Sequence, residues 1–94
     1  MAREVGEAHL LVIEANTSSV FPLPALRGIV TIGRAPEVEL RLDHSSVSRK
    51  HARIVVEPDG IEITDLDSHN GTRVNGAAVR GARALVDGDV VAVG

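Results

Sequence analysis

Residues 47–66 read VSRKHARIVVEPDGIEITDL, and this stretch decides the fold. Apolar side chains occupy every second position of residues 52–56, a period that predicts a strand with one face in the core. Residues 58–60, Pro-Asp-Gly, are typical of a turn. Residues 61–66 then resume the apolar pattern, so the stretch predicts a β-hairpin.

Short apolar runs separated by turn residues continue on both sides of this hairpin. Residues 15–19 are polar and predict a loop, and the nearby prolines restrict residues 20–23 to a sheet edge. No window has the spacing of an amphipathic helix. The pattern therefore predicts an all-β sandwich of many short strands. Strands are expected at residues 10–14, 20–23, 29–32, 38–42, 52–56, 61–66 and 90–93.

The composition supports one small β-domain and excludes several functions. The chain has 94 residues, enough for a single core, and 44% of them are hydrophobic, with Phe21 as the one aromatic residue. A net charge of -3 and the lack of aromatic stacking platforms argue against nucleic-acid binding. There is no cysteine, hence no disulfide, thiol nucleophile or thiolate metal site.

Targeting and metal signals are also missing from the sequence. The apolar run at residues 9–13 is too short, and its flank too acidic, for a signal peptide or a membrane span. We therefore expect a cytoplasmic protein, and the alanine, valine and arginine content is typical of a GC-rich bacterial source. His44, His51 and His69 lack the spacing that puts two imidazoles on one face, so no metal site is expected.

Polar and charged residues gather at three places where a strand gives way to a loop. A phosphomonoester needs charge and several donors held at fixed angles. Arg34 offers a forked charge directly after Gly33, whose freedom in φ suits a sharp turn. Ser48 adds a hydroxyl and Arg49 a second guanidinium, which together can cover the three phosphate oxygens. The third place is Asn70, whose amide can pair with a peptide backbone.

Each of these residues also has a plain structural explanation. Taken singly, Arg34 and Arg49 are better explained as solvated charges and Ser48 as a turn hydroxyl. Only their combination with the Asn-Gly turns at residues 70–76 indicates a binding site. A catalytic triad of Ser48, His51 and Asp65 is not supported, since no oxyanion hole or leaving-group pocket accompanies it.

The three clusters together resemble the forkhead-associated (FHA) domain family. The family signature of Gly-Arg, Ser-x-x-His, Asn-Gly and a later Asn is matched by residues 33–34, 48–51, 70–71 and Asn75. The resemblance implies a β-sandwich of about 10–11 short strands in two antiparallel or mixed sheets, with ligand loops at one end. It also implies a binding module for phosphothreonine peptides, a function of the family rather than a deduction from composition.

The resemblance assigns roles position by position. Arg34 and Ser48 are expected to hold the phosphate, with Arg49 as a further donor, and Asn70 to hold the peptide main chain. His69 lies beside the phosphate, where it either contributes to binding, with affinity rising on mild acidification, or is a solvated loop histidine. The residues expected to support the site are Gly33, His51, Gly71, Thr72 and Asn75.

The match is weaker at the two ends of the chain. We expect residues 1–7 to be a flexible start and residues 8–94 to form the single FHA domain. The family usually continues past the part that resembles residues 90–94 into one more strand. We therefore expect either that a mobile tail was left out or that the domain lacks its final C-terminal strand and ends early, with an exposed edge that another chain could pair.

The sequence thus predicts a non-enzymatic module without cofactors. Its expected partner is a threonine-phosphorylated protein or peptide, a substrate of a Ser/Thr kinase, bound in cis or in trans. The alternative is a phosphate-independent interaction or assembly domain, but such relatives usually lose the Arg or the Ser of the site, and Arg34 and Ser48 are both present here. An enzyme ranks third, because no general acid, activated nucleophile or cofactor motif is found.

Overall fold

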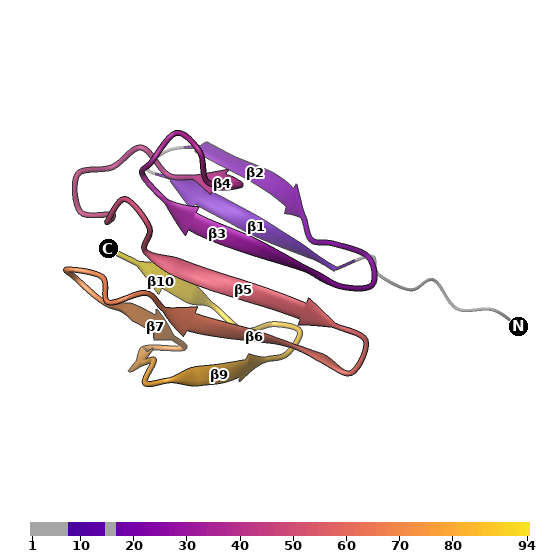
Figure 1. The fold of residues 1–94 in the computed structure, drawn as a ribbon. Coiled ribbons are helices and arrows are strands. Elements are labelled where there is room, and N and C mark those ends of the chain that lie inside the picture. Colours follow the sequence, from indigo (N-terminus) through magenta and orange to yellow (C-terminus); the bar gives the residue numbers. More distant parts are fainter. Residues whose placement is uncertain (1–7, 15–16) are drawn as a thin grey trace, which may run out of the picture.

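The computed structural model describes residues 8–14 and 17–94, which form ten β-strands in three hydrogen-bonded sheets (Figure 1). No helix occurs in this part of the chain, and the expected all-β class is confirmed. The N-terminal residues 1–7, expected to be flexible, lie outside the described residues. The strands are β1 (His9–Glu14), β2 (Thr17–Pro22), β3 (Gly28–Gly33), β4 (Leu40–Arg41), β5 (Ala52–Glu57), β6 (Gly60–Asp65), β7 (Thr72–Val74), β8 (Ala77–Ala78), β9 (Ala82–Leu85) and β10 (Val91–Val93).

The largest sheet has five strands in the order β4-β3-β5-β6-β9. It is mixed, because β3 and β4 run parallel while the other neighbours are antiparallel. Its centre is the hairpin of β5 and β6, joined by the expected turn and paired from Ala52↔Asp65 to Glu57↔Gly60. This confirms the hairpin predicted from residues 47–66.

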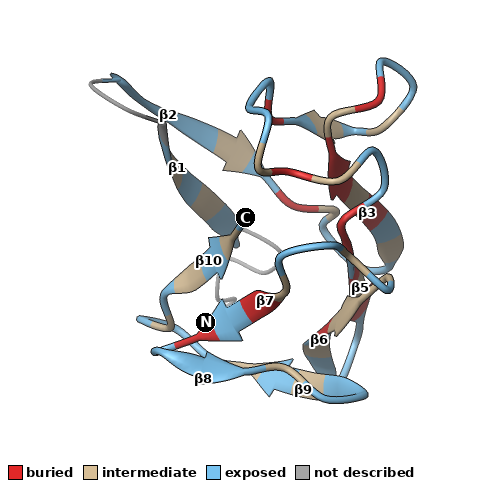
Figure 2. Cartoon of the chain, turned by 90° about the vertical axis from the view of Figure 1, so that its left-hand side faces the viewer, coloured by how far each residue is buried: buried red, intermediate tan, exposed pale blue. Residues whose placement is uncertain are grey.

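The second layer is divided into two smaller sheets. One is the β1–β2 hairpin, and the other has the order β10-β7-β8. Figure 2 shows β1, β2, β7 and β10 on the opposite side of the molecule from β3 and β5. The sandwich is therefore as expected, but the layer opposite the five-stranded sheet is not one continuous sheet.

The core lies between these layers and consists of aliphatic side chains. The alternation predicted for β5 is observed, since Ala52, Ile54 and Val56 are buried while Arg53 and Glu57 are exposed. Ile63 of β6 and Val74 of β7 are fully buried. Partly buried residues of β1, β2 and β10 complete the core, namely Leu10, Val12, Phe21, Val91 and Val93.

Two strand predictions were wrong in their extent. Residues 17–19, expected in a loop, belong to β2, because Ser18 and Ser19 pair with Ile13 and Val12 of β1. Residues 38–42 were expected to be a strand, but β4 is confined to Leu40–Arg41. Beside β4, the Glu39 carboxylate accepts a hydrogen bond from the backbone N–H of Thr31 at 2.7 Å, so a side chain takes the place of a ladder bond.

Several of the strand connections lie together at one end of the sandwich (Figure 1). Three of them are the turn after β3, the loop 42–51 between β4 and β5, and the loop 66–71 between β6 and β7. In Figure 1 all three lie at the left-hand end, away from the β5–β6 turn. The predicted site residues before Thr72 are all found here. In the described part of the chain, no helix exists that is long and apolar enough to cross a membrane.

Candidate functional site

Loop 42–51 crosses directly over the end of β3, and Gly33 makes this crossing feasible. A Cβ atom on Gly33 would overlap the backbone carbonyl of Arg49. The crossing is fixed by hydrogen bonds from Arg34 N to Ser48 O and from Ala35 N to Arg49 O, both 3.0 Å. Gly33 does not have a positive φ. The expectation that it serves conformational freedom was therefore wrong, because what the site requires is space.

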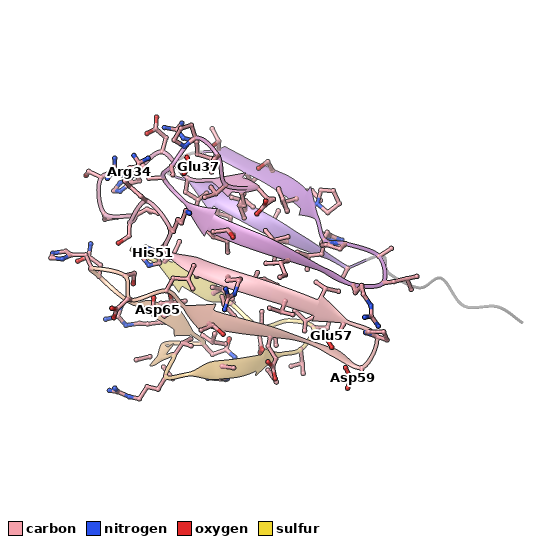
Figure 3. All side chains as sticks on the ribbon, in the orientation of Figure 1. Arg34, Glu37, His51, Glu57, Asp59 and Asp65 are labelled. Carbon is pink, nitrogen blue, oxygen red and sulfur yellow. The ribbon has the colours of Figure 1, made fainter. Side chains whose placement is uncertain are left out.

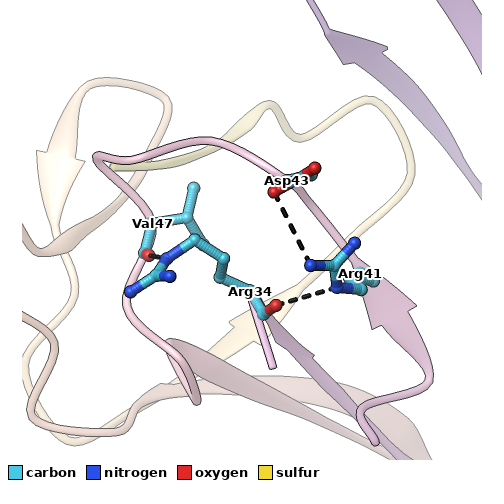
Figure 4. Close-up of polar contacts among 4 residues, drawn as sticks. All are labelled: Arg34, Arg41, Asp43 and Val47. Carbon is cyan, nitrogen blue, oxygen red and sulfur yellow. Dashed lines mark hydrogen bonds and ion pairs between the residues drawn. The ribbon is translucent and has the colours of Figure 1, made fainter. Parts of the chain in front are cut away.

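Arg34 is held by its neighbours in a way that leaves its anion-binding edge open. Its Nε donates to the carbonyl of Val47 at 3.0 Å, and its own carbonyl accepts from Nε of Arg41 at 2.8 Å (Figure 4). Among the described residues, the hydrogen bond that fixes the Arg34 side chain thus engages Nε. The two terminal nitrogens remain for a bidentate contact with an oxyanion.

Ser48 lies at this crossing, and its side chain connects loop 42–51 with loop 66–71. Its Oγ accepts a hydrogen bond from the backbone N–H of His69 at 2.9 Å. The hydroxyl proton is then left to be donated outward. Because Ser48 O also binds Arg34 N, the hydroxyl and the guanidinium are carried by the same connected segment of backbone.

His51 connects the same two loops from beneath, and its ring is fully buried. Nδ1 accepts from the backbone N–H of Ser48 at 3.0 Å, which requires that Nδ1 carry no proton. Nε2 then donates to the carbonyl of Gly71 at 2.8 Å. Both ring nitrogens are thereby engaged with backbone atoms, and the contact with Ser48 is to its N–H rather than to its hydroxyl.

Asp65 organises loop 66–71, a role that the sequence did not reveal. Its Oδ1 accepts from Ser68 Oγ at 2.6 Å and from Thr72 Oγ1 at 2.7 Å, while Oδ2 accepts from Ser68 N at 3.0 Å. Burial alone raises the pKa of the Asp65 carboxyl, but these hydrogen bonds hold the pKa below its ordinary value. The Asp-x-x-Ser spacing, typical of a side chain that caps its own turn, was the available signal.

Asn70 is an exposed residue of loop 66–71. Asn70 Nδ2 donates to the carbonyl of Ser46 at 2.8 Å, so the side chain spans to loop 42–51. Its Oδ1 is left as an acceptor. Gly71 follows with a φ of 86°, a left-handed conformation that glycine adopts at no steric cost, and its N–H donates to Ser68 Oγ at 2.9 Å.

The structure thus brings together all but one of the predicted site residues. Arg49 and His69 are exposed on the two adjacent loops, and Thr72 is buried against Asp65. Asn75 lies outside this network. Its side chain bonds Asp89 and Val90, and hydrogen bonds from Val86 N and from Asn75 lower the pKa of Asp89.

The cluster forms an open surface with several hydrogen-bond donors. Figure 3 shows Arg34, His51 and Asp65 at the loop end, while Glu57 and Asp59 lie at the opposite end. A hollow of about 260 Å³ lies elsewhere, between the start of β1 and the turn at residues 86–89. Within residues 8–14 and 17–94, no group of three potential metal ligands is found. The chemistry available at the loop end is anion binding.

Comparison with known proteins identifies the family. The family model of the FHA domain matches residues 30–94, and the chain therefore belongs to the FHA domain family. It is 49% identical over 67 residues, 71% of its length, to an ABC transporter ATP-binding/permease protein of Mycobacterium tuberculosis. The chain spans from 8% to 60% of the length of the first curated relatives it matches.

Solved structures agree with this membership. The FHA domain of the CT664 protein of Chlamydia trachomatis is 31% identical, with a TM-score of 0.81, covering 89% of this chain and 84% of that one. The N-terminal FHA domain of S. cerevisiae Rad53p, solved in complex with a phosphothreonine peptide, is 28% identical, with a TM-score of 0.71, covering 81% and 73%. The FHA-type sandwich predicted from the sequence is confirmed.

Proposed function

We propose that this FHA domain binds a phosphothreonine-containing segment of a protein. The observation that carries the proposal is the junction of Arg34 and Ser48, where open guanidinium nitrogens and a free hydroxyl proton are held by one crossing of the backbone. Such a set matches a dianionic phosphate with three strong acceptor oxygens. The phosphothreonine peptide bound by the Rad53p domain supports the same ligand class here.

The other exposed residues complete the proposed site. Arg49 and His69 lie on the two loops that flank Ser48 and would add donors around the phosphate. Asn70 has its Oδ1 available, since Nδ2 is engaged with Ser46 O, and would accept from the peptide backbone next to the phosphothreonine. Gly33, His51, Gly71 and Thr72 hold the loops in place rather than contact the ligand.

The proposed function is recognition without a chemical reaction. His51 has both ring nitrogens bound to backbone atoms, so it is not placed to activate Ser48 as a nucleophile. The partner is a Ser/Thr kinase substrate in the cytoplasm, either a separate protein or another part of the same polypeptide. Neither a cofactor nor nucleic acid or membrane enters the proposed interaction.

Calorimetry with matched peptides tests the proposal. A screen of degenerate phosphothreonine peptides selects a sequence, which is then compared with its phosphoserine and unphosphorylated forms. We expect no measurable binding of the unphosphorylated peptide. The phosphothreonine form should bind about fivefold tighter than phosphoserine, since burial of one methyl group contributes roughly 1 kcal/mol. Equal affinity for all three peptides would instead indicate phosphate-independent binding.

The Arg34→Ala variant tests the site itself. It removes a charge-assisted contact worth about 1.5 to 3 kcal/mol, so affinity for the phosphothreonine peptide should fall roughly 10- to 150-fold. Arg53→Ala is the matched control, because Arg53 is an exposed arginine of β5 that points away from the core. An Arg34→Ala domain that binds as tightly as the Arg53→Ala control contradicts the proposal.

A further inference from the structure

The Arg41 side chain is hydrogen-bonded to the backbone of Arg34, the residue that we propose to contact the phosphate. Arg41 ends β4 and pairs with Gly33, the residue before Arg34. Its Nε donates to the carbonyl of Arg34 at 2.8 Å, and one terminal nitrogen lies 3.6 Å from Oδ1 of Asp43 (Figure 4). Arg34 is therefore held at its N–H by Ser48, at its side chain by Val47 and at its carbonyl by Arg41.

The hydrogen bond from Arg41 restrains the backbone of Arg34, just beyond the end of the short β3–β4 ladder. β4 has only two residues, and the ladder beside it continues to a bond from Leu42 N to Gly33 O at 2.8 Å. The next carbonyl, that of Arg34, lies beyond this ladder and has Arg41 Nε as its partner. Without that donor, the peptide group after Arg34 keeps only the hydrogen bond from Ala35 N to Arg49 O, so its plane is held at one side instead of two. The direction of the guanidinium then becomes less fixed.

Asp43 offsets the charge of Arg41, which argues against a purely electrostatic role for this arginine. The carboxylate lies beside the guanidinium, and both side chains are well exposed, at 46% for Arg41 and 75% for Asp43. Ion pairs at such exposure contribute little energy. The pair engages a terminal nitrogen of the same guanidinium whose Nε donates to the Arg34 carbonyl.

We infer that Arg41 is a positioning residue of the site, which fixes Arg34 in the conformation that accepts phosphate and does not itself bind the ligand. The inference rests on the proposed function, since it concerns the same phosphate contact. It assigns to Asp43 the supporting role of orienting Arg41. The loss of one such hydrogen bond corresponds to roughly a three- to tenfold loss of affinity.

A double-mutant cycle separates positioning from charge. Affinity for the selected phosphothreonine peptide is measured for wild type, Arg41→Met, Arg34→Ala and the double variant, with NMR titration for the weak binders. We expect Arg41→Met to weaken binding roughly three- to tenfold in the wild-type background and less than about twofold beside Arg34→Ala. The loss of affinity caused by Arg41→Met should persist at high salt. An effect of charge alone would instead shrink, because salt screens it.

Two controls make the outcome decisive. Arg53→Met removes the same charge from an exposed site on β5 and should leave affinity unchanged. Thermal unfolding of Arg41→Met shows whether its fold is intact. Arg41→Lys provides a second variant, which keeps the charge but lacks the guanidinium fork, and we expect it to lose part of the affinity for the peptide. Equal losses in both backgrounds, or no loss in wild type, overturn the inference. If Arg34→Ala alone leaves binding intact, the proposed function itself fails.

Discussion

At the scale of single residues, the buried ring of His51 connects loops that are far apart in the sequence. Its Nδ1 accepts a hydrogen bond from the Ser48 N–H, and its Nε2 donates to the Gly71 carbonyl. The backbone of His51 also donates to Ile32 and accepts from Leu66. One residue therefore ties the end of β3, loop 42–51 and loop 66–71 together.

Replacement of His51 by alanine should destabilise the whole domain. The substitution opens a cavity and leaves the Ser48 N–H and the Gly71 carbonyl without their partners, at a combined cost of about 2 to 4 kcal/mol. Urea unfolding followed by far-ultraviolet circular dichroism measures this change. His69→Ala is the control, since His69 is exposed and its stability contribution should be negligible. An unchanged urea midpoint in His51→Ala would falsify the supporting role.

At the scale of elements, the crossing of loop 42–51 over β3 depends on the absence of a side chain at Gly33. In Gly33→Ala the new methyl group would collide with the Arg49 carbonyl. The loop must shift, and Arg34 and Ser48 shift with it, so we expect a loss of about 1 to 3 kcal/mol in stability together with weaker phosphopeptide binding.

A second glycine provides the matched control for this substitution. Gly60 begins β6 directly after the β5–β6 turn, and there a methyl group would meet no atom within 4 Å beyond the adjacent residues. Gly60 does not have a positive φ. Gly60→Ala should therefore keep both the wild-type melting temperature and the wild-type affinity. If the two alanine variants behave alike in calorimetry and peptide titration, the steric role of Gly33 is refuted.

Loop 66–71 should be sensitive to acid because of Asp65. Its pKa is lowered in the folded protein from an ordinary value of 3.8, so the ionised carboxylate stabilises the fold. This contribution is present above the unfolded pKa and is lost as the pH falls through the lowered folded pKa. The free energy of unfolding should therefore decrease less steeply from about pH 5 to pH 2 in Asp65→Asn than in wild type.

The same variant should also be less stable at neutral pH. An amide in place of the carboxylate cannot accept from Ser68 N, Ser68 Oγ and Thr72 Oγ1 together, a loss of about 1 to 3 kcal/mol. Asp67→Asn is a suitable comparison, because asparagine tolerates the positive φ of 61° found at Asp67. Parallel pH profiles for wild type and Asp65→Asn would contradict this account.

The sequence revealed elements where periodicity and turn residues agree. The hairpin of β5 and β6 has both signals, and the resemblance to the FHA signature assigned His51 to the support of the site. Prediction from the sequence was wrong where the extent of a strand is set by contacts with residues elsewhere in the chain. Thr17 to Ser19 are polar but are drawn into β2 by pairing with β1, and the carboxylate of Glu39 stands beside the shortened β4.

At the scale of the whole molecule, the loops of the proposed site are fixed by hydrogen bonds within the protein itself. The backbone N–H groups of Arg34, Ser48 and His69 all have partners within the protein. We expect these three amides to exchange slowly with solvent in the free domain and to change little on addition of a phosphopeptide. Hydrogen exchange followed by NMR measures this directly. Fast exchange in the free domain, with protection only in the complex, would indicate that the ligand orders the loops instead.

The division of the second layer into the β1–β2 hairpin and the β10-β7-β8 sheet could not be predicted from the sequence. The β1–β2 hairpin is bonded only within itself among the described strands and packs on the core through side chains such as Leu10, Val12 and Phe21. Local patterns predict that a strand exists and which face is buried. They do not predict which edges meet, because pairing depends on contacts between residues distant in the chain.

The ties between the loops have a consequence for how such a site can change over generations. His51, Asn70 and Arg34 each reach across to a backbone atom, namely Gly71 O, Ser46 O and Val47 O. A backbone carbonyl survives substitution of its own side chain. Side chains at neighbouring loop positions can therefore be exchanged while these contacts between the loops are retained.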